Sequence, residues 1–317
     1  MARKNEIEEA VSQSCAALRP RAKSIIMTVW GDAIAPHGGD IWLGSLIELM
    51  RPLGLTERAV RTSVFRLQKE GWLTSRQIGR RSYYAFSQAG SRRAEQAERR
   101  IYANGVPPWD GRWHLIIANA RDIESETREA LRRELAWQGF GIVSPGCFAH
   151  PAADVDALNG LLDDLGVTDQ VVVMRGDGLQ AATSKPIRRM IDGSWDIAGL
   201  SESWREILDQ FEPVARLLEA AGDAPREASF VVRSLLIHEY RRVLLRDPDL
   251  PEELLPADWA GTAARELCHA IYRRVWRPAE AHLMSVLETA DGRLPAASQS
   301  FYRRFGGLKA SDRAAAE

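Results

Sequence analysis

Residues 54–71 show the spacing of an amphipathic helix, and the residues that follow show the pattern of a β-hairpin. The apolar positions recur at the four-then-three spacing of one buried helical face, at Val60, Val64 and Leu67. Thr56 can cap the start of this helix, and Gly71 can end it. Residues 72–86 then have strand-like sequence on both sides of a turn at 79–81. We therefore predict a helix that runs directly into a hairpin.

The polar side chains of this helix and hairpin indicate a DNA-binding surface. A major groove is wide enough to admit a helix, and arginine or threonine near the helix N-terminus can reach base edges and phosphates there. Arginines on a hairpin can contact the phosphate backbone beside it. The predicted DNA-binding residues on the helix are Arg58, Arg61, Thr62, Phe65 and Lys69, and those on the hairpin are Arg76, Arg80, Arg81 and Tyr83.

Two apolar segments upstream, 22–30 and 41–50, are predicted to be supporting helices, separated by a break at 36–39. The order helix, helix, helix, hairpin is typical of a winged helix-turn-helix. The alternative is an amphipathic helix with a solvated basic face beside an ordinary hairpin. Charge favours the first interpretation, because residues 1–105 hold 17 Lys or Arg and 10 Asp or Glu, a net charge of +7, whereas residues 106–317 carry a net charge of −8.

The central segment alternates between strand-like and helical patterns after a break at 105–108. Helical periodicity covers residues 124–137 and 155–165. Strand-like apolar runs lie at 113–118, 141–148 and 170–174. This alternation predicts a small ferredoxin-like α+β domain.

From residue 199 onward the periodicity is almost wholly helical. Residues 202–221 form the first predicted helix, in which Pro213 predicts a kink or break. Residues 230–245 and 258–287 form two more, and the first of these is apolar nearly all round, which is typical of a buried helix. The predicted fold class is α+β and multidomain, with a mainly helical last domain. The predicted domains are 1–105, 106–185 and 186–317.

Charged and aromatic side chains gather on these last two predicted helices. Charges on a largely buried helix must be paired or must face a ligand. One interpretation is an internal ion-pair network, in which the neutralising carboxylates are Glu239, Asp247, Asp258 or Glu266. The other is a pocket for an anionic effector with an apolar group. The candidate effector-binding residues are His238, Tyr240, Arg241, Arg242, Tyr272, Arg273, Arg274, Trp276 and Arg277.

Several short motifs are shared with a known family. In the N-terminal region they are Gly-Leu-Thr-Glu-Arg-Ala-Val-Arg-Thr-Ser-Val at 54–64 with Leu67, Gly-Trp-Leu at 71–73 and Gly-Arg-Arg-Ser-Tyr-Tyr at 79–84. Far downstream they are His-Glu-Tyr-Arg-Arg at 238–242 and the segments 245–251 and 254–261. With these motifs in this order, the chain resembles the PaaX-type transcriptional repressors, which regulate phenylacetic acid catabolism in bacteria.

The resemblance implies a homodimeric repressor that binds double-stranded operator DNA. It also implies that a CoA-thioester effector, phenylacetyl-CoA or a related acyl-CoA, releases the repressor, and that the ferredoxin-like domain takes part in dimerisation. Release requires that the effector prefer the state that cannot bind DNA. The alternative, from a different class, is an enzyme recruited to nucleic acid, with its chemistry in the C-terminal or central domain.

Motifs for catalysis or metal binding are missing from the sequence. His238-Glu239 resembles the start of an H-E-x-x-H zinc motif, but the fifth position is Arg242. The three cysteines, Cys15, Cys147 and Cys268, are far apart, which argues against a disulfide framework and a four-thiolate zinc site. No apolar run approaches the length of a membrane span, and the N-terminus lacks the apolar core of a signal peptide. We therefore expect no catalytic residues, no metal, no cofactor, no membrane partner and a cytoplasmic location.

Overall fold

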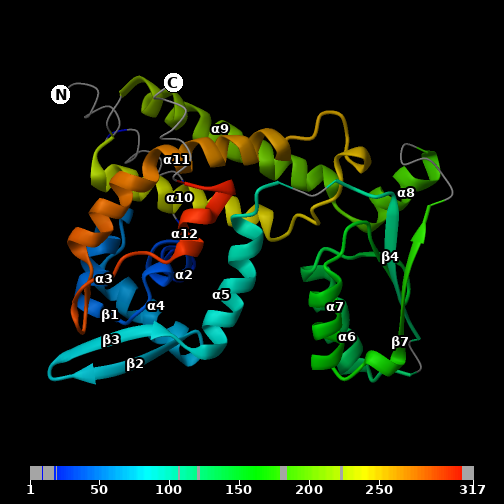
Figure 1. Ribbon diagram of the computed structural model, residues 1–317, viewed down its shortest axis with the longest axis horizontal. Helices are drawn as coiled ribbons and strands as arrows, with labels where there is room; N and C mark the ends of the chain where they lie inside the picture. Colours follow the sequence, from blue (N-terminus) through cyan, green and yellow to red (C-terminus); the bar gives the residue numbers. More distant parts are fainter. Residues whose placement is uncertain are drawn as a thin grey trace. The chain divides into compact units, whose positions relative to one another are not determined.

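The computed structural model describes residues 9, 18, 20–105, 108–119, 122–178, 184–221 and 224–308 (Figure 1). The chain forms two compact units. The first unit is built from residues 1–104, 206–242 and 262–317, and the second from residues 105–205 and 243–261. The first unit thus combines the predicted N-terminal domain with most of the predicted C-terminal domain.

The N-terminal part of the first unit contains the predicted helices and hairpin. Its elements are α2 (Ala22–Val29), α3 (Leu43–Met50), α4 (Glu57–Lys69), β2 (Leu73–Ile78), β3 (Arg81–Phe86) and α5 (Gln88–Ile101). Thr56 caps α4 as predicted, because its hydroxyl accepts a hydrogen bond of 3.3 Å from the backbone N–H of Ala59. Gly71 follows the helix in the left-handed region, with a φ of 76°.

The segment predicted as one helix over 41–50 begins instead with a short strand, β1 (Ile41–Trp42). This strand lies between β3 and β8 (Glu288–Thr289). Strand β8 also pairs with β9 (Gly292–Arg293). Ile41 is opposite Tyr84 on one side and Thr289 on the other. The two residues of β1 are too few to show a strand period, so the sequence pattern did not separate them from α3.

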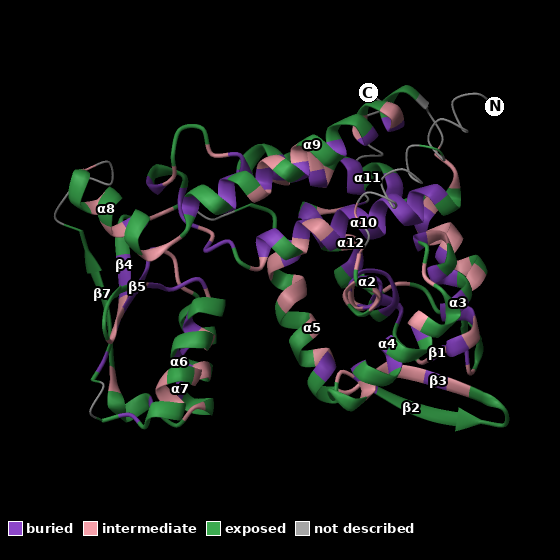
Figure 2. Cartoon of the chain, turned by 180° about the vertical axis from the view of Figure 1, so that it is seen from behind, coloured by how far each residue is buried: buried purple, intermediate pink, exposed green. Residues whose placement is uncertain are grey.

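The C-terminal part of the first unit is helical, and Figure 2 shows that most of its helix α10 is buried. Its helices are α10 (Arg226–Leu244), α11 (Gly261–Val286) and α12 (Gln299–Arg303), together with most of α9 (Ile197–Ala221). Helix α9 continues through Pro213, so the break allowed there by the sequence does not form. Between α2 and β1 the chain makes one π-helical turn, η1 (Trp30–Ile34), and one 3₁₀ turn, η2 (Ala35–His37).

The second unit contains a four-stranded antiparallel sheet in the order β5-β6-β4-β7. Its elements are β4 (Arg112–Ala118), α6 (Ser125–Trp137), β5 (Gly141–Ser144), β6 (Cys147–His150), α7 (Val155–Asp164), β7 (Val171–Asp177) and α8 (Lys185–Ser194). The single strand predicted over 141–148 is therefore wrong. A turn at Pro145 and Gly146, where Gly146 has a φ of 76°, divides it into a hairpin.

Both faces of this sheet carry a core. On one face, Ile116 of β4 packs with Leu131 of α6 and Leu158 of α7. On the other face, Trp113 packs with residues that include Ile191 of α8. Residues 113 and 116 lie on opposite faces because strand side chains alternate. The fold class is α+β, as predicted.

Candidate nucleic-acid interface

Helix α4 presents its predicted DNA-binding side chains to solvent. All five of them, Arg58, Arg61, Thr62, Phe65 and Lys69, are exposed, whereas Val60, Val64 and Leu67 are buried. Phe65 is 55% exposed, and the Lys69 ammonium lies 5.0 Å from the centre of its ring. The Arg61 guanidinium donates a hydrogen bond of 2.7 Å to Glu57 one turn earlier. The helix therefore has one packed face and one cationic face.

The hairpin β2–β3 carries three arginines, all of them exposed. Arg76 pairs with Asp40, which immediately precedes β1. Arg81 pairs with Glu288 of β8 at 2.9 Å, and its guanidinium lies 4.1 Å from the centre of the Trp42 ring. Arg80 is at the turn between the two strands.

Tyr83 differs from the other predicted DNA-binding residues because it is only 5% exposed. It lies opposite Arg76 on β2 and opposite Trp42 on β1, so these three side chains share one face of the sheet. Arg81, two residues earlier on the same strand, also shares that face. Tyr83 is therefore a buried member of this layer, which the alternation of side chains along the strand could not reveal.

The predicted effector-binding residues fall into two groups, and the first group is buried against α2. The Nδ1 atom of His238 is 2.9 Å from the hydroxyl of Thr28, to which Arg241 also donates a hydrogen bond of 2.7 Å. Burial lowers the pKa of His238 to about 3, and the neighbouring Arg241 and Arg242 act in the same direction. Tyr240 is also buried. His238 and Arg241 thus attach α10 to α2.

Tyr272 belongs to a buried polar cluster centred on Asp32. The carboxylate of Asp32 accepts hydrogen bonds from the hydroxyls of Tyr102 at 2.5 Å and Tyr272 at 2.9 Å, and from Arg233 at 2.7 Å. Arg304 approaches the same carboxylate at 3.2 Å and donates to the backbone oxygen of Asp32 at 2.7 Å. Asp32 lies in the π-helical turn η1, and π-helical turns are frequent at functional sites.

A second layer of ion pairs surrounds this cluster. Arg233 also contacts Glu280 at 2.5 Å, and Glu280 accepts a hydrogen bond of 2.9 Å from His37. Burial opposes ionisation of Glu280, but Arg233 and His37 outweigh it and lower the pKa of its carboxyl. Arg304 pairs with Glu98 of α5 at 2.9 Å. The network therefore joins α5, the η1 turn and the C-terminal helices of the first unit.

The sequence reasoning missed Asp32, Arg233 and Arg304 as the centre of the network. Of the acids it named, Asp247 accepts a hydrogen bond from Trp204, Asp258 pairs with Arg205 and Glu239 pairs with Arg242. A signal for Asp32 was present, because it is the only acidic residue in the apolar stretch 22–39. A lone acid among apolar residues has to find cationic or hydroxyl partners when the segment is buried.

The second group of predicted effector-binding residues faces outward on α10 and α11. Arg242, Arg273, Arg274 and Arg277 are exposed. Arg273 donates to the backbone oxygen of Phe305 at 2.5 Å, and Arg274 donates to that of Glu219 at 3.3 Å. The guanidinium of Arg277 lies 5.1 Å from the Trp276 ring. The structure thus does not bring all nine predicted residues into one pocket.

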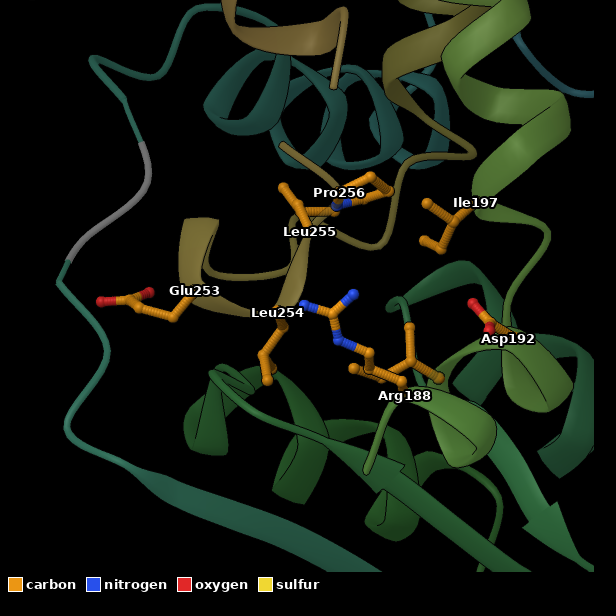
Figure 3. A pocket seen from close by; sticks show the side chains of 8 residues that line it. Arg188, Asp192, Ile197, Glu253, Leu254, Leu255 and Pro256 are labelled. Carbon is orange, nitrogen blue, oxygen red and sulfur yellow. The ribbon is translucent and has the colours of Figure 1, made fainter. Parts of the chain in front are cut away.

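Two cavities lie elsewhere in the described residues. One, of about 570 Å³, belongs to the first unit and is lined by aromatic residues, Trp30 and Phe86, and by the carboxylates of Glu95 and Glu98, among others. The other, of about 100 Å³, lies in the second unit between Arg188 of α8 and Leu254 (Figure 3). Neither is lined by a residue predicted to bind the effector.

Within the described part of the chain, no cluster of three or more His, Cys, Asp or Glu side chains could hold a metal ion. Cys147 and Cys268 are free thiols, and Cys15 lies outside the described residues. None of the helices described is both long enough and apolar enough to cross a membrane.

Sequence comparison places the chain among transcriptional regulators rather than enzymes. It is 39% identical over 305 residues to the transcriptional repressor PaaX of Escherichia coli (strain K12), an alignment that covers 96% of each chain. The chain belongs to the PaaX-like family. Residues 21–90 match the PaaX-like protein family, residues 106–187 its central Cas2-like domain and residues 195–285 its C-terminal domain.

A solved structure is also similar to this chain. It is the uncharacterized protein Rv0674 from Mycobacterium tuberculosis, with a TM-score of 0.53 and 25% sequence identity. The match covers 80% of this chain and 96% of that one.

Proposed function

We propose that this protein is a sequence-specific transcriptional repressor of an operon for phenylacetate-like aromatic acids, and that residues 20–87 are its winged helix-turn-helix. The observation that carries the proposal is the exposed cationic face of α4, followed at once by a hairpin with three exposed arginines. The relative from Escherichia coli is named a transcriptional repressor, which supports the same function.

In this proposal α4 enters the major groove and the hairpin acts as the wing. Arg61 and Thr62 are exposed near the middle of α4 and are separated from its buried face, so they are suited to contact base edges. Arg80 and Arg81 adjoin the turn of the hairpin, where they are suited to contact phosphates. Base contacts give specificity, whereas phosphate contacts mainly give affinity.

We propose further that the second unit is ferredoxin-like and forms the homodimer through β7. Its order β4-α6-β5-β6-α7-β7 is the β-α-β-β-α-β order of that fold. Strand β7 is at the end of the sheet, and its Val172 and Met174 side chains are 55% and 50% exposed. An open, apolar edge strand favours aggregation unless another chain covers it. Pairing of β7 with its own copy about a two-fold axis would cover both edges at once.

The dimer is tested by sedimentation of Met174→Lys beside a matched control, Val143→Lys. Val143 is an exposed valine on β5 at the opposite end of the same sheet. We expect the β7 variant to be monomeric and the control to remain dimeric. A dimeric Met174→Lys protein would contradict the assignment to β7.

The proposed effector is a CoA thioester of an aromatic acid, phenylacetyl-CoA or a close relative. Its phosphates require cations, and α11 carries three exposed arginines that could supply them, Arg273, Arg274 and Arg277. The buried His238 and the partly buried Arg241 already hold α10 against α2, which supports a structural role for them instead.

The experiment that tests this function is a gel-shift titration on the DNA upstream of the gene, with and without phenylacetyl-CoA. We expect a discrete complex that competitor DNA of scrambled sequence does not displace and that the thioester dissociates. Equal binding to scrambled DNA would contradict sequence-specific repression. Binding that is specific but insensitive to acyl-CoA thioesters would contradict only the effector.

A further inference from the structure

Two carboxylates from outside the hairpin lie beside its arginines. Strand β1 pairs with β3, and β8 pairs with β1, so the sheet that contains the hairpin also includes a segment from the C-terminal part of the chain. Asp40 immediately precedes β1, and Glu288 is the first residue of β8. The sheet therefore places one acid of each segment next to β2 and β3.

Each of these acids forms an ion pair with one arginine of the hairpin. Arg76 bonds to Asp40, and Arg81 bonds to Glu288 at 2.9 Å. Arg76 lowers the pKa of the Asp40 carboxyl through its hydrogen bond, so this acid stays ionised. Hydrogen bonds to Tyr83 and then to Glu288 raise the pKa of Arg81. The backbone of Glu288 is held in turn, because its N–H donates to the hydroxyl of Ser45 at 3.1 Å.

We propose that Asp40 and Glu288 compete with DNA phosphates for Arg76 and Arg81, and that they thereby limit the affinity of the wing for DNA. This inference rests on the proposed DNA-binding function. A carboxylate and a phosphate present similar oxygen acceptors to a guanidinium, so an arginine bonded to one is not available to the other in the same geometry.

The exposure of the Arg81–Glu288 pair makes exchange feasible. Both side chains are about half exposed, and ion pairs of this kind contribute little to stability. DNA can therefore displace Glu288 at small cost, although the displaced carboxylate remains near the phosphates and repels them. Arg80 forms no ion pair within the part of the chain that the structure describes. It therefore contacts DNA without competition from a carboxylate.

The position of Glu288 depends on the C-terminal helices. Helix α11 ends at Val286, and β8 begins two residues later. A shift of α11 would therefore move Glu288 toward or away from Arg81. The proposed effector-binding arginines lie on α11, so this acid is a direct connection between that helix and the wing.

The test measures duplex binding by fluorescence anisotropy over a range of salt concentrations for Glu288→Gln. The matched control is Glu212→Gln, because Glu212 is an exposed acid of α9 in the first unit that pairs with Arg216 at 2.9 Å, outside the proposed winged helix-turn-helix. We expect Glu288→Gln to bind DNA about three- to tenfold more tightly at low salt. A plot of the logarithm of its association constant against the logarithm of the salt concentration should also be steeper by up to about 0.9, the value of one added phosphate contact. The control should change affinity less than about twofold, as expected for one screened charge.

Two double-variant comparisons separate competition for the arginine from a general effect of charge. In an Arg81→Ala background, Glu288→Gln should no longer tighten binding, because the competed arginine is absent. Asp40→Asn should tighten binding in the wild-type background and lose its effect in Arg76→Ala.

The same tightening with and without Arg81 would overturn the inference, and so would weaker binding by Glu288→Gln, which would mean that Glu288 orients Arg81 for DNA. In either case the wild-type protein still binds DNA, so the proposed function stands. A wild-type protein that binds no duplex would contradict the function and the inference together.

Discussion

Replacement of Asp32 by asparagine should destabilise the first unit strongly. The four side chains that bond to the Asp32 carboxylate, Tyr102, Tyr272, Arg233 and Arg304, are all buried donors. An asparagine has nearly the same shape, but its amide nitrogen donates and so must face a donor in either orientation. It also leaves two buried guanidiniums with one acid fewer.

The size of the effect follows from burial. Removing one partner of a buried ion pair costs about 3–5 kcal/mol, because the remaining charge is left uncompensated. This is a large part of the roughly 5–15 kcal/mol by which a typical folded protein is stable. Tyr272→Phe removes the hydrogen bond that the hydroxyl donates to Asp32 and the one of 3.0 Å that it accepts from Arg304. This loss should cost at least about 1.5–3 kcal/mol, the value for one hydrogen bond with a charged group.

Urea denaturation followed by circular dichroism provides the measurement. The midpoint for Asp32→Asn should fall while the slope of free energy against urea stays the same, which identifies a change in stability rather than in exposed surface. Glu212→Gln removes the exposed ion pair with Arg216 and should change the free energy of unfolding by at most about 1 kcal/mol. If Asp32→Asn costs no more than this control, the Asp32 cluster does not hold the unit together.

Three further predictions concern the wing, the effector and pH. Replacing Arg80 and Arg81 together by alanine should weaken binding to all duplexes alike and flatten the salt dependence of log K, whereas a loss confined to the operator would contradict phosphate contact. Arg274→Ala should give a folded repressor that phenylacetyl-CoA no longer releases from DNA, and normal release of this variant would remove α11 from the effector site. Arg241→Ala should instead lower the melting temperature, because it removes partly buried hydrogen bonds to Ser24 and Thr28. Burial lowers the pKa of His238 to about 3 in the folded protein, so the imidazole of the unfolded chain is protonated first as the pH falls. The free energy of unfolding should therefore be highest above about pH 6.5 and should decrease progressively toward pH 3. Urea midpoints at several pH values should show a smaller loss in His238→Gln, and an equal loss in both proteins would mean that other groups dominate.

Local patterns in the sequence were enough to predict the central elements of the candidate site. The stripe of Val60, Val64 and Leu67 fixes which face of α4 is buried, and Thr56 fixes where the helix begins. These features depend on residues within a few positions of one another, so a sequence pattern contains them. The exposure of the α4 cations follows from the same stripe.

Features that depend on distant partners could not be predicted in this way. Asp32 bonds to Arg233 and Arg304, which are 201 and 272 positions away, and Glu288 reaches Arg81 across 207 positions. The two residues of β1 form a strand only because β3 and β8 lie on either side. Tyr83 is buried because side chains from neighbouring strands share its face of the sheet. Each of these depends on tertiary contacts that local periodicity does not encode.

The central claim is that α4 reads the operator sequence, and the most direct test is the ratio of dissociation constants for scrambled and operator duplexes. Arg61→Ala and Thr62→Ala should each reduce this ratio by about 5- to 150-fold, which corresponds to about 1–3 kcal/mol for a lost base contact. Both variants should keep the wild-type melting temperature, because Arg61 and Thr62 lie off the buried face. An unchanged ratio in both folded variants would contradict the claim that α4 reads the DNA.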